Sequence, residues 1–166
     1  MYGEIHAIVE EEHVAAVRDN VLTASGLGLT PNYLVGKRAL DAGVGGMGRA
    51  LKGLFRLGCR DITAIDISAE NIRNAWRKNG NISEFVSFKT KNVLELDYPE
   101  ESFHFIHCSG VLHHTQSPPE ALKQLYRCLS PGGWIYLGLY GKGGLLYGTA
   151  RLARLLAKAV PYRTAA

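Results

Sequence analysis

Two hydrophobic periods alternate along the chain, and their order predicts an α/β fold. Short apolar or alternating stretches, typical of strands, occupy residues 37–42, 61–68, 84–93, 102–110 and 134–141. Segments with apolar side chains at helical spacing follow the first, second and fourth strands, at residues 48–59, 68–80 and 117–130. Strands that alternate with helices form right-handed crossovers. We therefore predict a Rossmann-like, doubly wound parallel sheet with helices on both faces.

Both ends of the chain also carry a helical pattern. Apolar residues such as Ile5, Ile8 and Val9 recur near helical spacing, which predicts a helix over residues 2–23. Another helix is expected over residues 145–160. The predicted domains are an N-terminal helical cap (1–35), a core (36–141), and a C-terminal helix with a tail (142–166).

The helix predicted over residues 68–80 has clear boundary signals. Ser68 stands where an N-cap side chain accepts a main-chain N–H, and Glu70 lies in the first turn. Gly80 follows the last turn, where glycine commonly ends a helix. These signals place the helix directly after the second strand.

Composition fits a single globular domain. The 166 residues are 46% hydrophobic and 20% charged, and no apolar run reaches the roughly 20 residues of a membrane-spanning helix. The first residues lack the basic-then-apolar order of a signal peptide, so a cytoplasmic location is expected. The net charge of +4 is too small to favour a nucleic-acid partner. Because Cys59, Cys108 and Cys128 are far apart, neither a metal site nor a disulfide framework is expected.

A glycine-rich loop follows the first core strand. The stretch LDAGVGGMG, residues 40–48, places four glycines in six residues directly behind Asp41. Gly43, Gly45 and Gly48 fit the GxGxxG pattern that binds dinucleotides, and the same loop nearly fits the DxGxG pattern that holds S-adenosylmethionine. Asp66 ends the second strand, where a carboxylate can accept both ribose hydroxyls of an adenosine. Both cofactors contain that adenosine, so these residues leave both open; a plain tight turn and a helix-capping aspartate are the non-binding alternatives.

Four stretches in order resemble the motifs of one family, the class I S-adenosylmethionine-dependent methyltransferases, in particular their small-molecule branch. They are LDAGVGG, AIDIS, KNVLELDYPEESFHFIHCSGVLHHT and ALKQLYRCLSPGGWIYL. The resemblance covers residues 36–141 and implies S-adenosyl-L-methionine as cofactor and methyl transfer to a small-molecule acceptor. In this family an antiparallel hairpin completes the sheet. The present sequence shows only one helix after the fifth strand, so a truncated family sheet is expected.

The resemblance assigns the first half of the cofactor site to the ends of two strands. Asp41 would reach the methionyl amine and orient the loop. Gly43, Gly45 and Gly46 would line the methionyl part of the cofactor. Asp66 would hold the ribose.

The second half of the site would contact the adenine and the far side of the methionyl group. By resemblance, Ile67 would pack on the adenine, and Asn92 and Val93 would face its edge. Ser109 and Gly110, preceded by Cys108, would border the methionyl amine through backbone groups.

Three positions depart from the family pattern. Met47 stands where the family has its third glycine, so the loop is expected to be one residue longer. Asn92 replaces the usual Asp, and its carbonyl can still accept from an adenine amino group. His104 stands where the family has Asp in the fourth strand.

Two histidines are candidates for a general base. Methyl transfer is an in-line displacement, which depends mainly on positioning, but a hydroxyl acceptor also needs a base. His113 and His114 follow the fourth strand, and the resemblance places them beside the methyl group. A packing or helix-end role for both is the alternative.

The same sequence features are compatible with two other functions. A nicotinamide-dependent oxidoreductase would use the same GxGxxG loop, and a truncated, non-catalytic methyltransferase-like module would bind a partner. If the sheet ends at residues 134–141, the fifth strand has an unpaired apolar edge. We therefore expect self-association or a partner chain at this edge.

Overall fold

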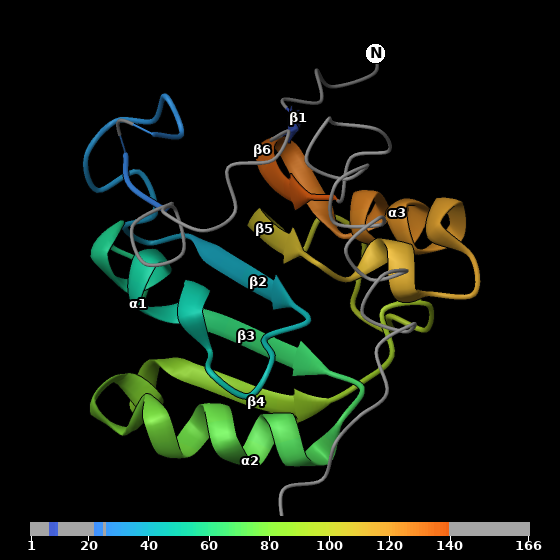
Figure 1. Ribbon diagram of the computed structural model, residues 1–166. Coiled ribbons are helices and arrows are strands. Elements are labelled where there is room, and N and C mark those ends of the chain that lie inside the picture. The colour runs from blue at the N-terminus through green and yellow to red at the C-terminus, as the bar shows by residue number, and fades with distance from the viewer. Residues whose placement is uncertain (1–6, 10–21, 25, 140–166) are drawn as a thin grey trace, which may run out of the picture.

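The computed structural model describes residues 7–9, 22–24 and 26–139, which form one parallel sheet with helices on both faces (Figure 1). The strands are β1 (Ala7–Val9), β2 (Arg38–Ala42), β3 (Asp61–Asp66), β4 (Val86–Thr90), β5 (Phe103–Ser109) and β6 (Leu129–Gly138). The helices are α1 (Arg49–Arg56), α2 (Ala69–Lys78), α3 (Pro118–Arg127) and the 3₁₀ helices η1 (Gly80–Phe85) and η2 (Leu112–His114).

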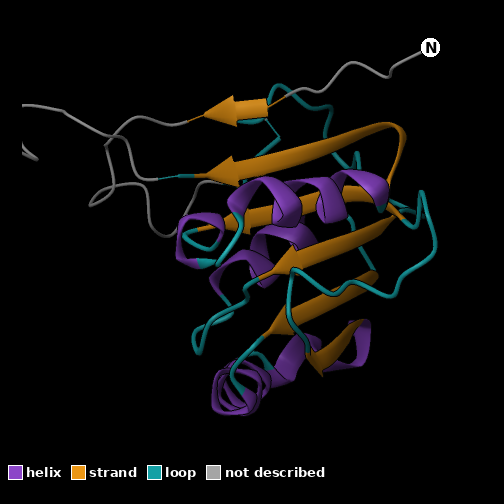
Figure 2. Ribbon diagram, turned by 90° about the vertical axis from the view of Figure 1, so that its right-hand side faces the viewer, coloured by secondary structure: helices purple, strands orange, loops and turns teal. Residues whose placement is uncertain are grey.

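The strand order is β1-β6-β5-β2-β3-β4, and every neighbouring pair is parallel (Figure 2). The chain moves outward from β2 through β3 to β4, and then returns to the other side of β2 with β5 and β6. The predicted Rossmann-like parallel α/β fold is confirmed. The reversal beside β2 creates the switch point at which such sheets bind ligands.

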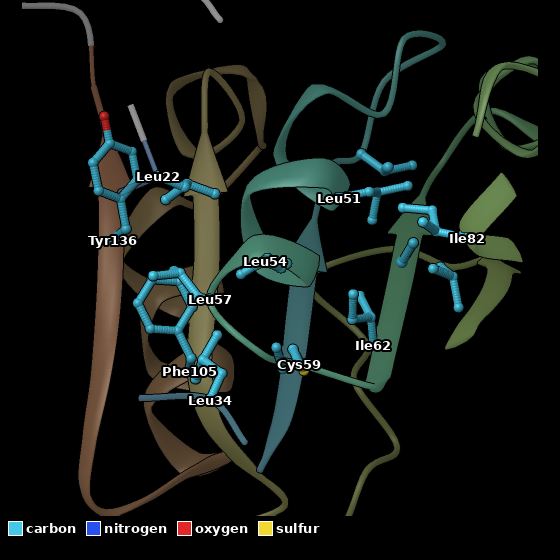
Figure 3. Packing of buried hydrophobic residues seen from close by; sticks show 14 of the residues in the cluster. Leu22, Leu34, Leu51, Leu54, Leu57, Cys59, Ile62, Ile82, Phe105 and Tyr136 are labelled. Atoms are coloured by element: carbon cyan, nitrogen blue, oxygen red, sulfur yellow. The ribbon is translucent and has the colours of Figure 1, made fainter. Parts of the chain in front are cut away.

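Two hydrophobic clusters hold the helices to the sheet. The first, here the α1-side cluster, joins Leu51 and Leu54 of α1 to sheet residues such as Phe105 and Tyr136 (Figure 3). The second, the α3-side cluster, includes Ala121 of α3. Side chains along a strand point alternately to opposite faces, so each central strand contributes to both clusters.

The boundaries of α2 agree with the sequence signals. The Oγ of Ser68 accepts the N–H of Asn71 at 3.2 Å, which satisfies one of the free donors of the first turn. Glu70 lies in that first turn, and Arg77 and Lys78 lie in the last, where each charge complements the helix dipole. The predicted start of this helix is therefore confirmed.

The N-terminal prediction is wrong where the structure describes it. Ala7–Val9 form strand β1 rather than part of a helix, and they pair with Ile135–Leu137 of β6. Ile8 and Val9 are β-branched residues, which favour strands. As a result, the edge of β6 is paired along this stretch, contrary to the expected unpaired edge. The helix predicted over residues 145–160 lies outside the described residues.

The last strand begins earlier than predicted. β6 starts at Leu129, which pairs with Phe103, whereas Trp134 pairs with Phe105. The register therefore shifts across residues 131–133, the PGG segment, which bulges from the strand instead of preceding it.

None of the helices in the described part of the chain has the length and apolar character of a membrane span.

Candidate active site

The carboxyl ends of three adjacent strands bring the predicted site residues together. Because β5, β2 and β3 are neighbours and parallel, the segments that follow them leave the sheet at the same edge. The glycine loop follows β2, Asp66 ends β3, and Ser109 ends β5. This edge is where an open α/β sheet binds its ligand.

The glycine loop is fixed to the end of β3 by its backbone. The N–H groups of Gly43 and Val44 both donate to the carbonyl of Ile65, at 2.8 and 2.9 Å. Gly43 has a φ of 86°, and a Cβ at this position would collide with the Val111 side chain. Gly45 has a φ of 59°, but no atom of the described residues lies within 4 Å of the place that its Cβ would take. Gly43 is thus required by packing, whereas Gly45 faces open space in which a ligand can approach the backbone.

The second half of the loop packs against α2. A Cβ on Gly46 would lie 3.3 Å from the Asn71 side chain, so this glycine faces the helix. The buried amide of Asn79 donates to the carbonyl of Met47 at 3.2 Å and to that of Ala75 at 2.9 Å. The predicted role of Gly46 in lining the ligand stays a prediction. Sequence reasoning missed both asparagines: Asn79 bonds the loop at Met47, and the side chain of Asn71 bonds Asp66.

The carboxylate of Asp66 connects the glycine loop with the start of α2. Its Oδ2 accepts the N–H of Gly45 at 2.9 Å. Its Oδ1 accepts the N–H of Ser68 at 2.9 Å and the side-chain amide of Asn71 at 3.1 Å. A carboxylate oxygen accepts about two hydrogen bonds, so Oδ2 retains one acceptor position.

Asp41 is a second, more deeply buried carboxylate. It is 1% exposed, and its Oδ1 lies 2.8 Å from Nδ1 of His107 on β5. A carboxylate can only accept, so the Nδ1–H of His107 is the donor. Within the described part of the chain, Oδ2 of Asp41 has no hydrogen-bond partner. A buried acceptor without a partner can accept a hydrogen bond from a donor group of a ligand.

The residues predicted to contact an adenine differ in exposure and in the hydrogen bonds that they already make. Ile67 is 73% exposed beside Asp66, which is unusual for an isoleucine and suits an apolar contact with a flat ring. The Oδ1 of Asn92 accepts the N–H of Leu94 at 3.0 Å, so this side chain is held in a local turn. Val93 is buried in the α3-side cluster, and only its main chain could reach a ligand.

The end of β5 presents backbone rather than reactive side chains. In the part of the chain that the structure describes, no atom lies within 4 Å of the place that a Cβ on Gly110 would take, and the N–H of Gly110 donates to the carbonyl of Gly138 at 2.9 Å. Ser109 is exposed. Burial raises the pKa of the Cys108 thiol to about 12, with a smaller contribution from Asp41. Cys108 is therefore a neutral thiol at physiological pH, and only its backbone suits the predicted contact.

The two candidate bases lie side by side in η2, directly after β5. His113 is half-buried and His114 exposed, with ring centroids 4.2 Å apart. Burial and the neighbouring His114 lower the pKa of His113 below 6.5. His113 is neutral at pH 7 and can accept a proton there.

Comparisons with known proteins agree with this geometry. A family model described as "Methyltransferase domain" matches residues 40–137. A ubiquinone biosynthesis O-methyltransferase of Xanthomonas oryzae pv. oryzae is 30% identical over 129 residues, which are 74% of this chain and 53% of the relative. A 27-O-demethylrifamycin SV methyltransferase of Amycolatopsis mediterranei is 30% identical over 62% of this chain and 38% of the relative. The chain thus spans about half or less of the length of these curated relatives.

Solved structures show the same fold. A SAM-dependent methyltransferase from Aquifex aeolicus matches with a TM-score of 0.55 at 20% identity, over 75% of this chain and 72% of that one. The [4+2]-cyclase SpnF matches with a TM-score of 0.54 at 29% identity, over 61% of this chain and 38% of that one. The family match covers most of the described core, including the glycine loop, Asp66 and both candidate bases. The chain therefore belongs to the class I S-adenosylmethionine-dependent methyltransferase family.

Proposed function

We propose that this chain binds S-adenosylmethionine at the carboxyl ends of β2, β3 and β5 and transfers its methyl group to a small-molecule acceptor. The observation that carries the proposal is the buried Oδ2 of Asp41, which has no partner among the described residues. The cofactor of this family has a cationic amino group, which can donate to such an oxygen with charge assistance.

The same carboxylate disfavours a nicotinamide dinucleotide. The diphosphate of that cofactor is anionic and offers no hydrogen-bond donors, whereas Asp41 can only accept. An anion beside a buried carboxylate is repelled in a region of low dielectric. Asp41 can accept a hydrogen bond from the cationic amino group of S-adenosylmethionine but would repel the diphosphate of NAD. The site therefore supports S-adenosylmethionine over NAD as the cofactor.

Several residues would hold the adenosine. Asp66 has one acceptor position left on Oδ2, so we expect it to accept one ribose hydroxyl while it keeps the bond from Gly45. The exposed Ile67 would cover the adenine. The open backbone at Gly45 and Gly110 would allow close approach.

When bound, S-adenosylmethionine supplies a methyl group that its sulfonium already activates. The chain then has to hold an acceptor in line with that group, which can contribute much of the about 7–11 kcal/mol available from effective molarity. His113, neutral at pH 7 because burial lowers its pKa, would take the proton of a hydroxyl acceptor. The names of the two curated relatives, both of which include an oxygen methylation, support a hydroxyl on a small molecule as the acceptor class.

Two measurements together separate the candidate functions. Calorimetric titration of the full chain with S-adenosylhomocysteine and with NADH measures cofactor choice, and mass spectrometry after incubation with S-adenosylmethionine and a panel of phenols and catechols detects methylated product. The product must be observed directly, because one structure with a similar fold is a [4+2]-cyclase. Binding of S-adenosylhomocysteine with a product supports the proposal. Binding without a product favours a non-catalytic module, and binding of NADH alone overturns the proposal.

A further inference from the structure

Three residues stand directly opposite one another on adjacent strands beside the proposed cofactor site. The register pairs Asp41 of β2 with His107 of β5, and His107 with Tyr136 of β6. The His107 ring is stacked on the Tyr136 ring, with centroids 5.2 Å apart and planes at 11°. The row lies on the face of the sheet that carries the α1-side cluster, to which Tyr136 belongs (Figure 3).

The row holds the carboxylate of Asp41 in one orientation. His107 donates to Oδ1 at 2.8 Å, and its side chain is only 14% exposed, so little water competes for this hydrogen bond. The stacked Tyr136 ring, which is 6% exposed, restricts rotation of the imidazole. With Oδ1 engaged, Oδ2 is the oxygen that remains available to a ligand.

A histidine is suited to this task for a chemical reason. Without the Nδ1–H donor, both oxygens of a nearly fully buried carboxylate would lack partners, and each buried acceptor without a partner has a free-energy cost. A donor on one side stabilises the negative charge and fixes the rotamer, in the way that supporting residues orient catalytic or metal-binding groups.

We propose that His107 is a positioning residue for the amino acid part of the cofactor. It acts through Asp41, whose free oxygen it keeps oriented toward a cationic amino group. This inference rests on the proposed function, because it assumes that a ligand with such a group binds at Asp41. In this proposal, His107 supports ligand binding through Asp41 and makes no contact of its own with the ligand.

The test compares two ligands that differ in the amino acid part. S-adenosylhomocysteine carries the amino group, and 5′-methylthioadenosine has the same adenosine and thioether without it. His107→Phe keeps a flat ring against Tyr136 but removes the donor, whereas His107→Asn offers an amide N–H near the Nδ1 position. We expect His107→Phe to weaken S-adenosylhomocysteine binding about tenfold or more and methylthioadenosine binding by less than about twofold. His107→Asn should recover most of the loss.

A histidine on the same strand gives a matched control. His104 accepts the main-chain N–H of Arg38 at 3.2 Å and lies near the start of β5, away from the site. His104→Phe should leave both affinities unchanged. If His107→Phe does not fold, His107→Asn and His107→Leu can be compared instead. These two side chains have a similar shape, and only Asn offers a donor to Asp41.

The outcomes separate this inference from the proposed function. If the wild-type chain binds neither ligand, the proposed function fails. If it binds both, and the loss of the donor at His107 lowers both affinities equally or changes neither, the positioning role is refuted. A loss confined to S-adenosylhomocysteine, which a purely structural role would not produce, supports it.

Discussion

The carboxylate of Asp66 joins the glycine loop to the start of α2, so its removal should weaken both stability and binding. It accepts three hydrogen bonds, from the N–H of Gly45, the N–H of Ser68 and the amide of Asn71. In Asp66→Ala, all three donors lose this acceptor at once. We expect the variant to lose about 2–4 kcal/mol of unfolding free energy and to bind S-adenosylhomocysteine at least about tenfold more weakly.

The expected loss of stability follows from the number of bonds and from their burial. A hydrogen bond to a charged group contributes about 1.5–3 kcal/mol, and a buried donor without a partner costs about 1–3 kcal/mol. Asp66 is 9% exposed, and all three bonds are partly buried. Water that enters after truncation will satisfy some of the donors. The total loss of unfolding free energy should therefore be well below three times the value of one such hydrogen bond.

Asp61 provides a matched control at the opposite end of the same strand. Its carboxylate pairs with Arg38 at 3.3 Å, and both side chains are exposed. Exposed ion pairs of this kind contribute about 0–1 kcal/mol. Asp61→Ala should therefore have little effect on stability and none on ligand binding.

Urea denaturation monitored by tryptophan fluorescence measures the unfolding free energy of both variants, and calorimetry measures ligand affinity. If Asp66→Ala proves as stable as Asp61→Ala, the hydrogen bonds at Asp66 do not support the loop as argued. If the variant is destabilised but keeps its affinity, Asp66 has no role in binding.

Three further predictions concern the same site. Asp41→Asn should reduce S-adenosylhomocysteine affinity by about 10- to 150-fold in calorimetry, yet change stability by less than about 1 kcal/mol because the new amide oxygen can still accept from His107. Gly43→Ala should cost about 2 kcal/mol or more in denaturation, through positive φ and the Val111 contact, whereas Gly45→Ala should cost less stability but impair binding. Burial lowers the pKa of His113, so the unfolded chain binds more protons between that lowered value and 6.5. Stability should therefore fall as pH is lowered through this window, and His113→Gln should remove that part of the dependence in denaturation at pH 5–8.

The positions of the glycine loop and Asp66 could be predicted because they follow from local patterns. The short stretch of residues 37–42 is typical of a buried strand, and the glycines that follow it end that strand. In the same way, Ser68 marks the start of α2 and so places Asp66 at the end of the preceding strand. Parallel strands then bring both segments to one edge without further information.

The partner of Asp41 could not be predicted in this way. His107 is 66 positions away in the sequence, and the two side chains meet only because of the register between β2 and β5. A local pattern does not determine register between distant strands. The buried Asn79 was also missed, because its hydrogen bond to Met47 depends on how the end of α2 packs against the loop, which no local pattern determines. β5 carries two histidines, His104 and His107, and the sequence alone does not indicate that His107 is the one opposite Asp41.

The structure of residues 7–9 illustrates how tertiary pairing overrides a weak periodicity. Apolar residues near helical spacing favoured a helix, but a strand of three residues is too short to display its own period. The open side of β6 offers main-chain donors and acceptors to any extended segment that reaches it. Once β1 pairs there, that stretch of β6 no longer supports the expected self-association.

The two carboxylates of the site have different tasks, and their hydrogen bonds show the division. Asp66 accepts three hydrogen bonds from internal donors, so its first task is to hold the loop, and under the proposed function it would bind the ribose through the acceptor position that remains. Asp41 is engaged on one side only, by His107, and keeps its other oxygen buried without a partner among the described residues. An unsatisfied buried acceptor costs about 1–3 kcal/mol, and a cationic amino group that binds there relieves this cost. Under the proposed function, the site would therefore gain affinity for the amino group of the cofactor because the fold leaves that one oxygen without a partner among the described residues.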